Sequence, residues 1–497
     1  MKPLKLYTIA AAIIAVTAIK CSNTGSKNVQ SAGNAPISKT VIIDGATKRH
    51  TIDGFGVNIT PAQWRNGNLK PAIDSLVDDL GCTLFRFDCV GLADWIDPSK
   101  RGADGKYPAD YLQQVYTNKT FSDAWATFKY LNSKKIIPQF NVSGRIPPAM
   151  GRKDDIKRLA DFEGYAEMIA TMLVWAREQE KLTFSILSPF NETDLGFPEG
   201  AKLEPEDVYP AVKAMVKKLD EYNLSDIKLV LMDDTRFIQE KLSPIISDTT
   251  LINRVMAFGT HSYGNGDEAE QGGWYDQPSD YYKMVQYINN SAYKGKPCWM
   301  TEYGDLDQTN EIEFEFAWRS TRRLLKFLDD GFSGAEAWDA FDNFHEHDTV
   351  WARYGLLKTD TTTTDWTYKP KDRYYTAKHV YKYVPAGWHV VNVSTPPLPK
   401  FDGYENWHAP LKNMRMLAFV SPDGKSFTLV GMSKIEQNVA LDIELRSLGI
   451  PSDKPLKMFV TSRNQKMVPS PEVSFSSTGH IKTTVKEGTI FTVTTLE

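Results

Sequence analysis

Two glutamates stand out in this 497-residue chain because each directly follows a short apolar segment. The segment Phe184–Phe190 is followed by Asn191 and Glu192, and the segment 298–301 is followed by Glu302. A carboxylate is costly to bury, so a glutamate at the tip of a buried strand is a candidate for chemistry. Two carboxyl groups that meet in one cleft indicate cleavage of a glycosidic bond.

The two glutamates can be given different roles. We assign Glu302 as the nucleophile that attacks the anomeric carbon, and Glu192 as the acid/base that protonates the leaving oxygen and later deprotonates water. An apolar strand and a nearby anion would raise the pKa of Glu192, as a proton donor requires. The assignment predicts carboxyl groups about 5–5.5 Å apart. It also predicts that Glu302→Gln abolishes turnover while sugar binding survives.

Other polar and aromatic residues fall at the ends of predicted strands and are expected to support the glutamates. They are Arg86, Asn191, His261, Tyr263 and Trp338. Arg86 and the Tyr263 hydroxyl would keep Glu302 ionised. Asn191 would hydrogen-bond the sugar 2-hydroxyl, and Trp338 would form the floor of the subsite. Each residue alone has a plainer structural explanation, such as a counter-ion or a core aromatic, and the combination favours chemistry.

These residues require a framework that brings strand ends together. Eight apolar segments, most of them continuous, are predicted as strands covered on both faces. They are Gly54–Thr60, Thr83–Cys89, Ile136–Val142, Phe184–Asn191, Lys228–Asp233, Val255–Tyr263, Cys298–Tyr303 and Gly334–Phe341. Helical patterns lie between them, at Asp155–Gln179, Glu206–Glu221 and Glu311–Asp330. This alternation predicts a (β/α)₈ TIM barrel over 53–375, whose active site lies at the carboxyl ends of the strands. A doubly wound sheet is the alternative, but no glycine-rich phosphate loop follows the first strand.

The pattern changes after about residue 376 to short β-rich runs separated by turn signals. We predict an attached antiparallel β-sandwich over 376–497. Near the N-terminus, Lys39–Ile43 and Lys48–Ile52 predict a β-hairpin around Asp44-Gly45. These strands, within 39–52, are expected to join the sandwich.

The first 21 residues predict a lipoprotein-type export signal. Lys2 and Lys5 precede an apolar stretch, Ile9–Ile19, that is too short to span a bilayer, and Cys21 is the predicted lipidation site. Segment 22–38 has almost no large apolar residue and predicts a flexible tether. We expect export to the periplasm or outer cell surface, with membrane attachment only through the lipid. Ordinary secretion is the alternative.

The composition of the chain excludes some classes of binding partner. The chain has a net charge of −4 without a basic block, which argues against nucleic acid. Its 12 Trp and 22 Tyr suit a carbohydrate binder and suit a large core equally well. We expect a monomer that needs no cofactor and no metal, although His345-Glu346-His347-Asp348 offers imidazole and carboxylate ligands. Asp233 and Asp234 are expected to cap a helix or bind sugar hydroxyls.

The strand-end motifs resemble clan A of the glycoside hydrolases, in which Asn-Glu closes the fourth barrel strand and Glu closes the seventh. Within that clan, Ile52-Asp53-Gly54-Phe55-Gly56 and the split side β-sandwich resemble family 30. Val57 and Thr193 depart from that family, where Gly and Pro are usual, and His261-Ser262-Tyr263 is more similar to family 5.

The resemblance implies a retaining β-glycoside hydrolase that acts on an oligo- or polysaccharide. Family 30 includes glucosylceramidases, β-1,6-glucanases, β-1,6-galactanases and xylanases. Two alternatives stay open: an arabinofuranosidase or xylosidase on the same framework, and a non-catalytic glycan-binding lipoprotein.

Overall fold

The computed structural model describes residues 36–88, 95–263, 279–304, 313–345, 350–395, 400–401, 404–405, 414–435, 437–451 and 453–497. The predicted signal with Cys21, most of the predicted tether, and Glu346–Asp348 lie outside these ranges. Residues 37 and 38, predicted as tether, belong to the first strand. In the described part of the chain, every helix is too short or too polar to span a bilayer.

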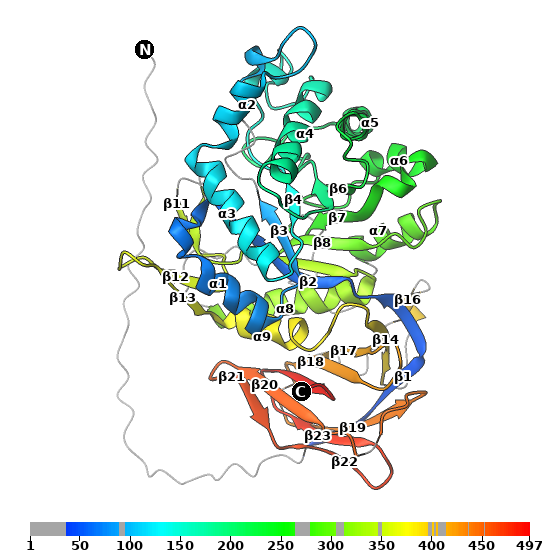
Figure 1. Cartoon of the computed structure of the whole chain (residues 1–497). Coiled ribbons are helices and arrows are strands. Elements are labelled where there is room, and N and C mark those ends of the chain that lie inside the picture. The colour runs from blue at the N-terminus through cyan, green and yellow to red at the C-terminus, as the bar shows by residue number, and fades with distance from the viewer. Residues whose placement is uncertain are drawn as a thin grey trace, which may run out of the picture. The chain divides into compact units, whose positions relative to one another are not determined.

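A closed parallel barrel is the larger part of the fold, with eight strands among the described residues (Figure 1). They are β2 (Gly54–Ile59), β3 (Leu84–Asp88), β4 (Gln139–Asn141), β5 (Ile186–Ser188), β6 (Lys228–Asp234), β7 (Val255–His261), β8 (Cys298–Tyr303) and β9 (Gly334–Ala337). β2 pairs with both β3 and β9, which closes the sheet. The predicted TIM barrel is therefore confirmed, and the doubly wound alternative is wrong.

Several barrel strands are shorter than predicted, and prolines explain two of them. β4 begins directly after Pro138, and β5 ends directly before Pro189. Proline has no backbone N–H to donate to a neighbouring strand, so the ladder stops there. Asn191 and Glu192 consequently lie on a loop just beyond β5 rather than on the strand itself.

Helices lie between the barrel strands and after them. Those described are α1 (Lys70–Asp74), α2 (Ala109–Tyr116), α3 (Lys119–Ser133), α4 (Phe162–Glu178), α5 (Pro205–Glu221), α6 (Gln239–Ser247), α7 (Asp280–Asn289), α8 (Glu313–Asp330) and α9 (Asp372–Tyr381). α4 starts later than predicted because Asp161 caps it, its carboxylate accepting the Gly164 N–H at 2.8 Å.

The second part is a ten-stranded sheet, in the order β21-β20-β24-β18-β17-β14-β1-β19-β23-β22. Its strands are β1 (Ile37–Thr51), β14 (His389–Ser394), β17 (Met414–Val420), β18 (Phe427–Ser433), β19 (Val439–Arg446), β20 (Lys457–Ser462), β21 (Gln465–Ser470), β22 (Val473–Phe475), β23 (Ile481–Val485) and β24 (Thr489–Thr494). The N-terminal strand thus shares a sheet with C-terminal strands, as predicted. Three small ribbons complete the described strands: β10 (Asn343–His345) with β11 (Val350–Ala352), β12 (Leu357–Asp360) with β13 (Thr367–Pro370), and β15 (Lys400–Phe401) with β16 (Tyr404–Glu405).

The hairpin predicted within residues 39–52 is wrong. β1 is one strand that pairs antiparallel with β14 and parallel with β19, so the sheet is not purely antiparallel. The register with β14 shifts between Asp44 and Lys48. The Asp44-Gly45 pair therefore lies in a bulge that bends the strand, where the sequence had indicated a turn.

Helix α9 connects the sheet to the barrel, and the predicted boundary at residue 376 falls inside it. The His379 ring lies 2.8 Å from the hydroxyls of both Thr461 and Thr492 in the sheet. The Tyr381 hydroxyl donates to the Gly56 carbonyl of β2 at 2.9 Å. The same helix thus contributes to both parts.

Candidate active site

Arg86 organises the inside of the barrel at the carboxyl ends of the strands. It lies on β3, and its side chain is fully buried. Its guanidinium donates to the side-chain oxygens of Asn58 at 2.7 Å, Asn141 at 2.8 Å, Asn191 at 2.6 Å and Glu302 at 2.5 Å. Because a guanidinium presents its donors in one rigid plane, Arg86 fixes these four side chains relative to one another.

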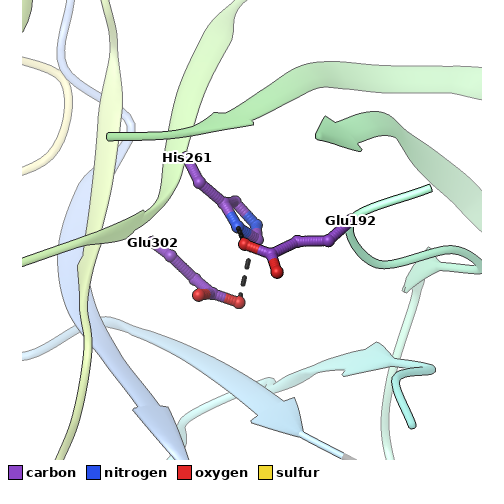
Figure 2. A group of neighbouring side chains, drawn as sticks. All are labelled: Glu192, His261 and Glu302. Carbon is purple, nitrogen blue, oxygen red and sulfur yellow. Dashed lines mark hydrogen bonds and ion pairs between the residues drawn. The ribbon is translucent and has the colours of Figure 1, made fainter. Parts of the chain in front are cut away.

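Glu192, His261 and Glu302 point toward one another, as Figure 2 shows. His261 Nδ1 lies 2.8 Å from Glu192 Oε1, and His261 Nε2 lies 3.5 Å from Glu302 Oε1. One carboxylate oxygen of each glutamate and one imidazole nitrogen all lie within 4.8 Å of one another. All three residues are at most 6% exposed. Two glutamates that are 110 positions apart in the sequence therefore share one buried site.

Different backbone features place these three side chains. Glu302 and His261 lie opposite each other on the paired strands β8 and β7. Glu192 lies beyond β5 with φ 42°, and its N–H donates to the Asp233 carbonyl at 2.8 Å. Met232 and Asp233, at the end of β6, also have positive φ, 89° and 37°. Such conformations are unfavourable for residues with a Cβ and cluster at functional sites.

Burial dominates the protonation of the two carboxyls. It raises the pKa of Glu192 well above its ordinary value, and the charges of Glu199 and Asp194 raise it further. Burial also raises the pKa of Glu302, but His261 and Arg86 oppose that rise. Because Arg86 hydrogen-bonds Glu302 directly, a proton shared by the pair resides on Glu192.

Burial lowers the pKa of His261 and favours the neutral imidazole, although the charge of Glu302 opposes that effect. A neutral imidazole has one donor and one acceptor nitrogen. With Glu192 protonated, the Glu192 O–H donates a hydrogen bond to Nδ1 at 2.8 Å, while Nε2 lies 3.5 Å from Glu302. His261 therefore orients Glu192 and lies between the two carboxyls.

The other predicted site residues are Asn191, Tyr263 and Trp338, and only some of their expected contacts are present. The Asn191 amide is held on both sides, since its oxygen accepts from Arg86 and its nitrogen donates to the Glu199 carbonyl at 2.9 Å. The Tyr263 ring packs against His261 with centroids 6.0 Å apart, but its hydroxyl has no hydrogen-bond partner among the described residues. The structure therefore does not show the predicted bond from Tyr263 to Glu302. Trp338 directly follows β9 and is partly exposed.

Asp233 and Asp234 have neither of the roles expected for them. Asp233 is fully buried, accepts hydrogen bonds from Ser188 and Thr301, and lies 3.5 Å from Arg86. Asp234 accepts from Thr193 at 2.6 Å and from Lys241 at 3.3 Å. Asp233 therefore braces strands of the barrel, whereas Asp234 connects the end of β6 to α6 and to the loop after β5. No helix starts directly after them, because the next described helix, α6, begins at Gln239.

Sequence reasoning missed polar residues within the strands themselves. Asn58 lies in β2 and donates to the Thr301 carbonyl at 2.9 Å while accepting from Arg86. Glu336 lies in β9 and accepts from Gln139 at 2.5 Å. The sequence does contain a signal for them, because each is a single polar residue inside an otherwise apolar strand. Burying such a side chain costs free energy unless another residue in the barrel interior forms a hydrogen bond with it.

The same three side chains are also potential metal ligands, since imidazole and carboxylate oxygens suit divalent cations. However, the Arg86 guanidinium already lies 2.5 Å from Glu302 Oε1. A dication bound to that oxygen would lie beside a fixed positive charge. The chemistry of this group therefore favours acid–base work over metal binding.

Comparisons with known proteins agree with this fold. No protein-family model and no curated protein sequence matches the chain. A xylanase of glycoside hydrolase family 30, subfamily 8, from Clostridium acetobutylicum matches with TM-score 0.66 and 16% identity, over 92% of this chain and 99% of that one. An endo-β-1,6-glucanase matches with TM-score 0.64 and 15% identity, over 93% and 95%. A monomeric β-xylosidase from Caulobacter crescentus CB15 matches with TM-score 0.56 and 14% identity, over 92% and 99%. The structural neighbours are thus family 30 and related clan A glycoside hydrolases, and at these identities they show a shared fold.

Proposed function

We propose that this protein is a retaining β-glycoside hydrolase that cleaves an oligo- or polysaccharide. The observation that carries the proposal is the buried pair Glu192 and Glu302, with oxygens within 4.8 Å of each other and Arg86 bonded to only one of them. The fold shared with known glycoside hydrolases supports it.

The asymmetry of the pair assigns the roles. Arg86 favours the ionised form of Glu302, which attacks the anomeric carbon and forms a glycosyl-enzyme as the leaving oxygen departs. Glu192 holds the proton and gives it to that oxygen. Water then enters, Glu192 removes a proton from it, and the sugar leaves Glu302 with its original anomeric configuration.

The spacing favours retention over inversion. Retaining enzymes place their carboxyl groups about 5–5.5 Å apart, whereas inverting enzymes need about 6.5–9.5 Å to accommodate a water. One oxygen of Glu192 lies within 4.8 Å of one oxygen of Glu302, which favours the shorter, retaining spacing.

A direct test uses Glu302→Gln and Glu192→Gln on a panel of chromogenic aryl glycosides, with NMR to follow the anomer first released. Glu302→Gln should abolish turnover. Glu192→Gln should still release a leaving group that needs no proton, but it should hydrolyse the glycosyl-enzyme slowly, because Glu192 also acts as the base for the incoming water. Release of the inverted anomer, or near-wild-type rates for Glu302→Gln, would overturn the proposal.

The similarity to a β-xylosidase keeps an arabinofuranosidase or xylosidase as the second candidate. The same glycoside panel separates it from an enzyme that acts on internal bonds of a polysaccharide. A non-catalytic glycan-binding lipoprotein would bind polysaccharide without releasing reducing sugar. We further propose that the chain is exported, anchored through Cys21 and monomeric.

A further inference from the structure

A hollow of about 830 Å³ lies where residues 63–71, the start of α3 and residues 364–366 meet. We call it the outer hollow. Residues 63–71 follow β2, and 364–366 form the tip of the β12–β13 ribbon, which follows β9 (Figure 1). α3 leads into β4, so its first turn lies at the carboxyl end of the barrel strands. The outer hollow is therefore on the same barrel face as Glu192 and Glu302.

Several polar groups of the outer hollow have no partner within the described residues. Gln63 Oε1 is buried without a hydrogen bond. The Arg65 guanidinium makes neither a hydrogen bond nor an ion pair there, and its only described contact is with Trp366. Lys119, in contrast, is neutralised by Asp123 at 2.7 Å. Gln63 Oε1 is closed off from the solvent, so Arg65 and Trp366 are the groups of this set that a ligand in the outer hollow can reach.

Trp366 and Arg65 are already held in place. The guanidinium carbon of Arg65 lies 3.9 Å from the centroid of the Trp366 ring. The Trp366 backbone N–H donates to Asn68 Oδ1 at 3.0 Å, and Trp351 packs edge-on against the indole at 5.6 Å. A ligand that contacts this pair would not have to order it first, which favours binding.

The chemistry of the walls selects the class of ligand. Arg65 and Lys119 are balanced by Asp123 and Asp365, so the outer hollow carries no net charge to attract a polyanion. The walls expose polar and apolar atoms in about equal amounts, which suits neither a lipid nor an apolar peptide. Neutral hydroxyl groups both donate and accept hydrogen bonds, as amides do. The volume is within the range of about 300–1,000 Å³ that is usual for ligand sites.

We propose that the outer hollow is a second glycan-binding site, which holds a neutral stretch of polysaccharide away from the catalytic pair. Arg65 and Trp366 are its main contacts. The choice of a glycan as ligand rests on the proposed function, but occupancy of the outer hollow does not require turnover.

The test is affinity gel electrophoresis of the full chain in gels that contain soluble xylan, β-1,6-glucan or β-1,6-galactan. The set comprises wild type, Arg65→Ala, Trp366→Ala and the control Arg463→Ala. Arg463 is also an exposed arginine over an aromatic ring, 5.6 Å from Phe314, but it lies in the sheet domain. We expect at least one polysaccharide to retard the wild type and the control, and both outer-hollow variants to bind it about tenfold more weakly, a loss of one aromatic or cation–π contact.

Rates on a small aryl glycoside are measured in parallel and should stay within about twofold for both variants, since that substrate is too short to reach the outer hollow. Equal retardation of all four proteins, or no retardation of the wild type by any of the polysaccharides, would overturn the second site. Comparing the outer-hollow variants in a Glu302→Gln background removes hydrolysis of the gel polysaccharide as a complication. If the wild type hydrolyses none of the glycosides, but Arg65→Ala and Trp366→Ala still weaken its retardation, the outer hollow is supported and only the proposed enzyme activity is refuted.

Discussion

Replacing Arg86 by Met tests whether its charge keeps Glu302 ionised. Arg86 lies 2.5 Å from Glu302, and both side chains are buried. An opposite charge this close lowers a carboxyl pKa by about 1–3 pH units. Without the guanidinium, only His261 still opposes the effect of burial, and the pKa of Glu302 rises by about that amount. Each pH unit corresponds to about 1.4 kcal/mol, so the ionisation constant of Glu302 should fall about 10- to 1,000-fold.

The assay is kcat/KM for an aryl glycoside as a function of pH. The acidic limb, which reports ionisation of the nucleophile in the free enzyme, should move to higher pH in Arg86→Met. Arg86→Lys is the matched control, because it keeps the charge but cannot reach Asn58, Asn141 and Asn191 with one planar group. We expect that variant to be slower, with its acidic limb close to that of the wild type.

Stability must be measured alongside activity. Arg86→Met leaves Glu302 and Asp233 buried without their cation, and breaking such a pair costs about 3–5 kcal/mol. Whole proteins are stable by only about 5–15 kcal/mol, so the variant should unfold at a visibly lower temperature. A folded Arg86→Met enzyme whose acidic limb does not move would refute the reasoning.

Further predictions concern pH, packing and export. Burial raises the pKa of Glu192 above its ordinary value of 4.5. The protonated carboxyl should therefore contribute its full stability below pH 4.5 and lose it as the pH rises. The melting temperature of Glu192→Gln should depend less on pH above 4.5 than that of the wild type. Gly56→Ala would place a Cβ 1.6 Å from the Leu84 carbonyl oxygen and should destabilise the fold by at least about 1–3 kcal/mol in denaturant titrations, whereas Gly449→Ala, with open space around it, should not. Cys21→Ala should move the protein from the membrane to the soluble fraction, and an unchanged membrane fraction would contradict lipidation at this residue.

The sequence allowed the barrel and its two glutamates to be predicted because both depend on local patterns. Continuous apolar strands mark a sheet covered on both faces, and a carboxylate just beyond such a strand is conspicuous. What it could not show was which polar side chains meet inside the barrel. Asn58 and Glu336 find their partners on strands distant in sequence, and that pairing depends on the closed register.

The Asp44-Gly45 pair illustrates a second limit. The same two residues suit a tight turn and a bulge, and the choice depends on which strand lies alongside. β1 has neighbours on both sides, β14 and β19, that come from the other end of the chain. Its continuity is thus a tertiary effect that no window of sequence around residue 44 contains.

The central place of β1 in the sheet also sets the order of assembly. β1 is synthesised long before β14 and β19, the strands on either side of it. It therefore stays unpaired in the sheet until nearly the whole polypeptide has been made. A chain truncated after the barrel would therefore have an unpaired β1 with exposed apolar residues, and we expect it to aggregate. The barrel and the sheet of this molecule are therefore expected to fold as one piece.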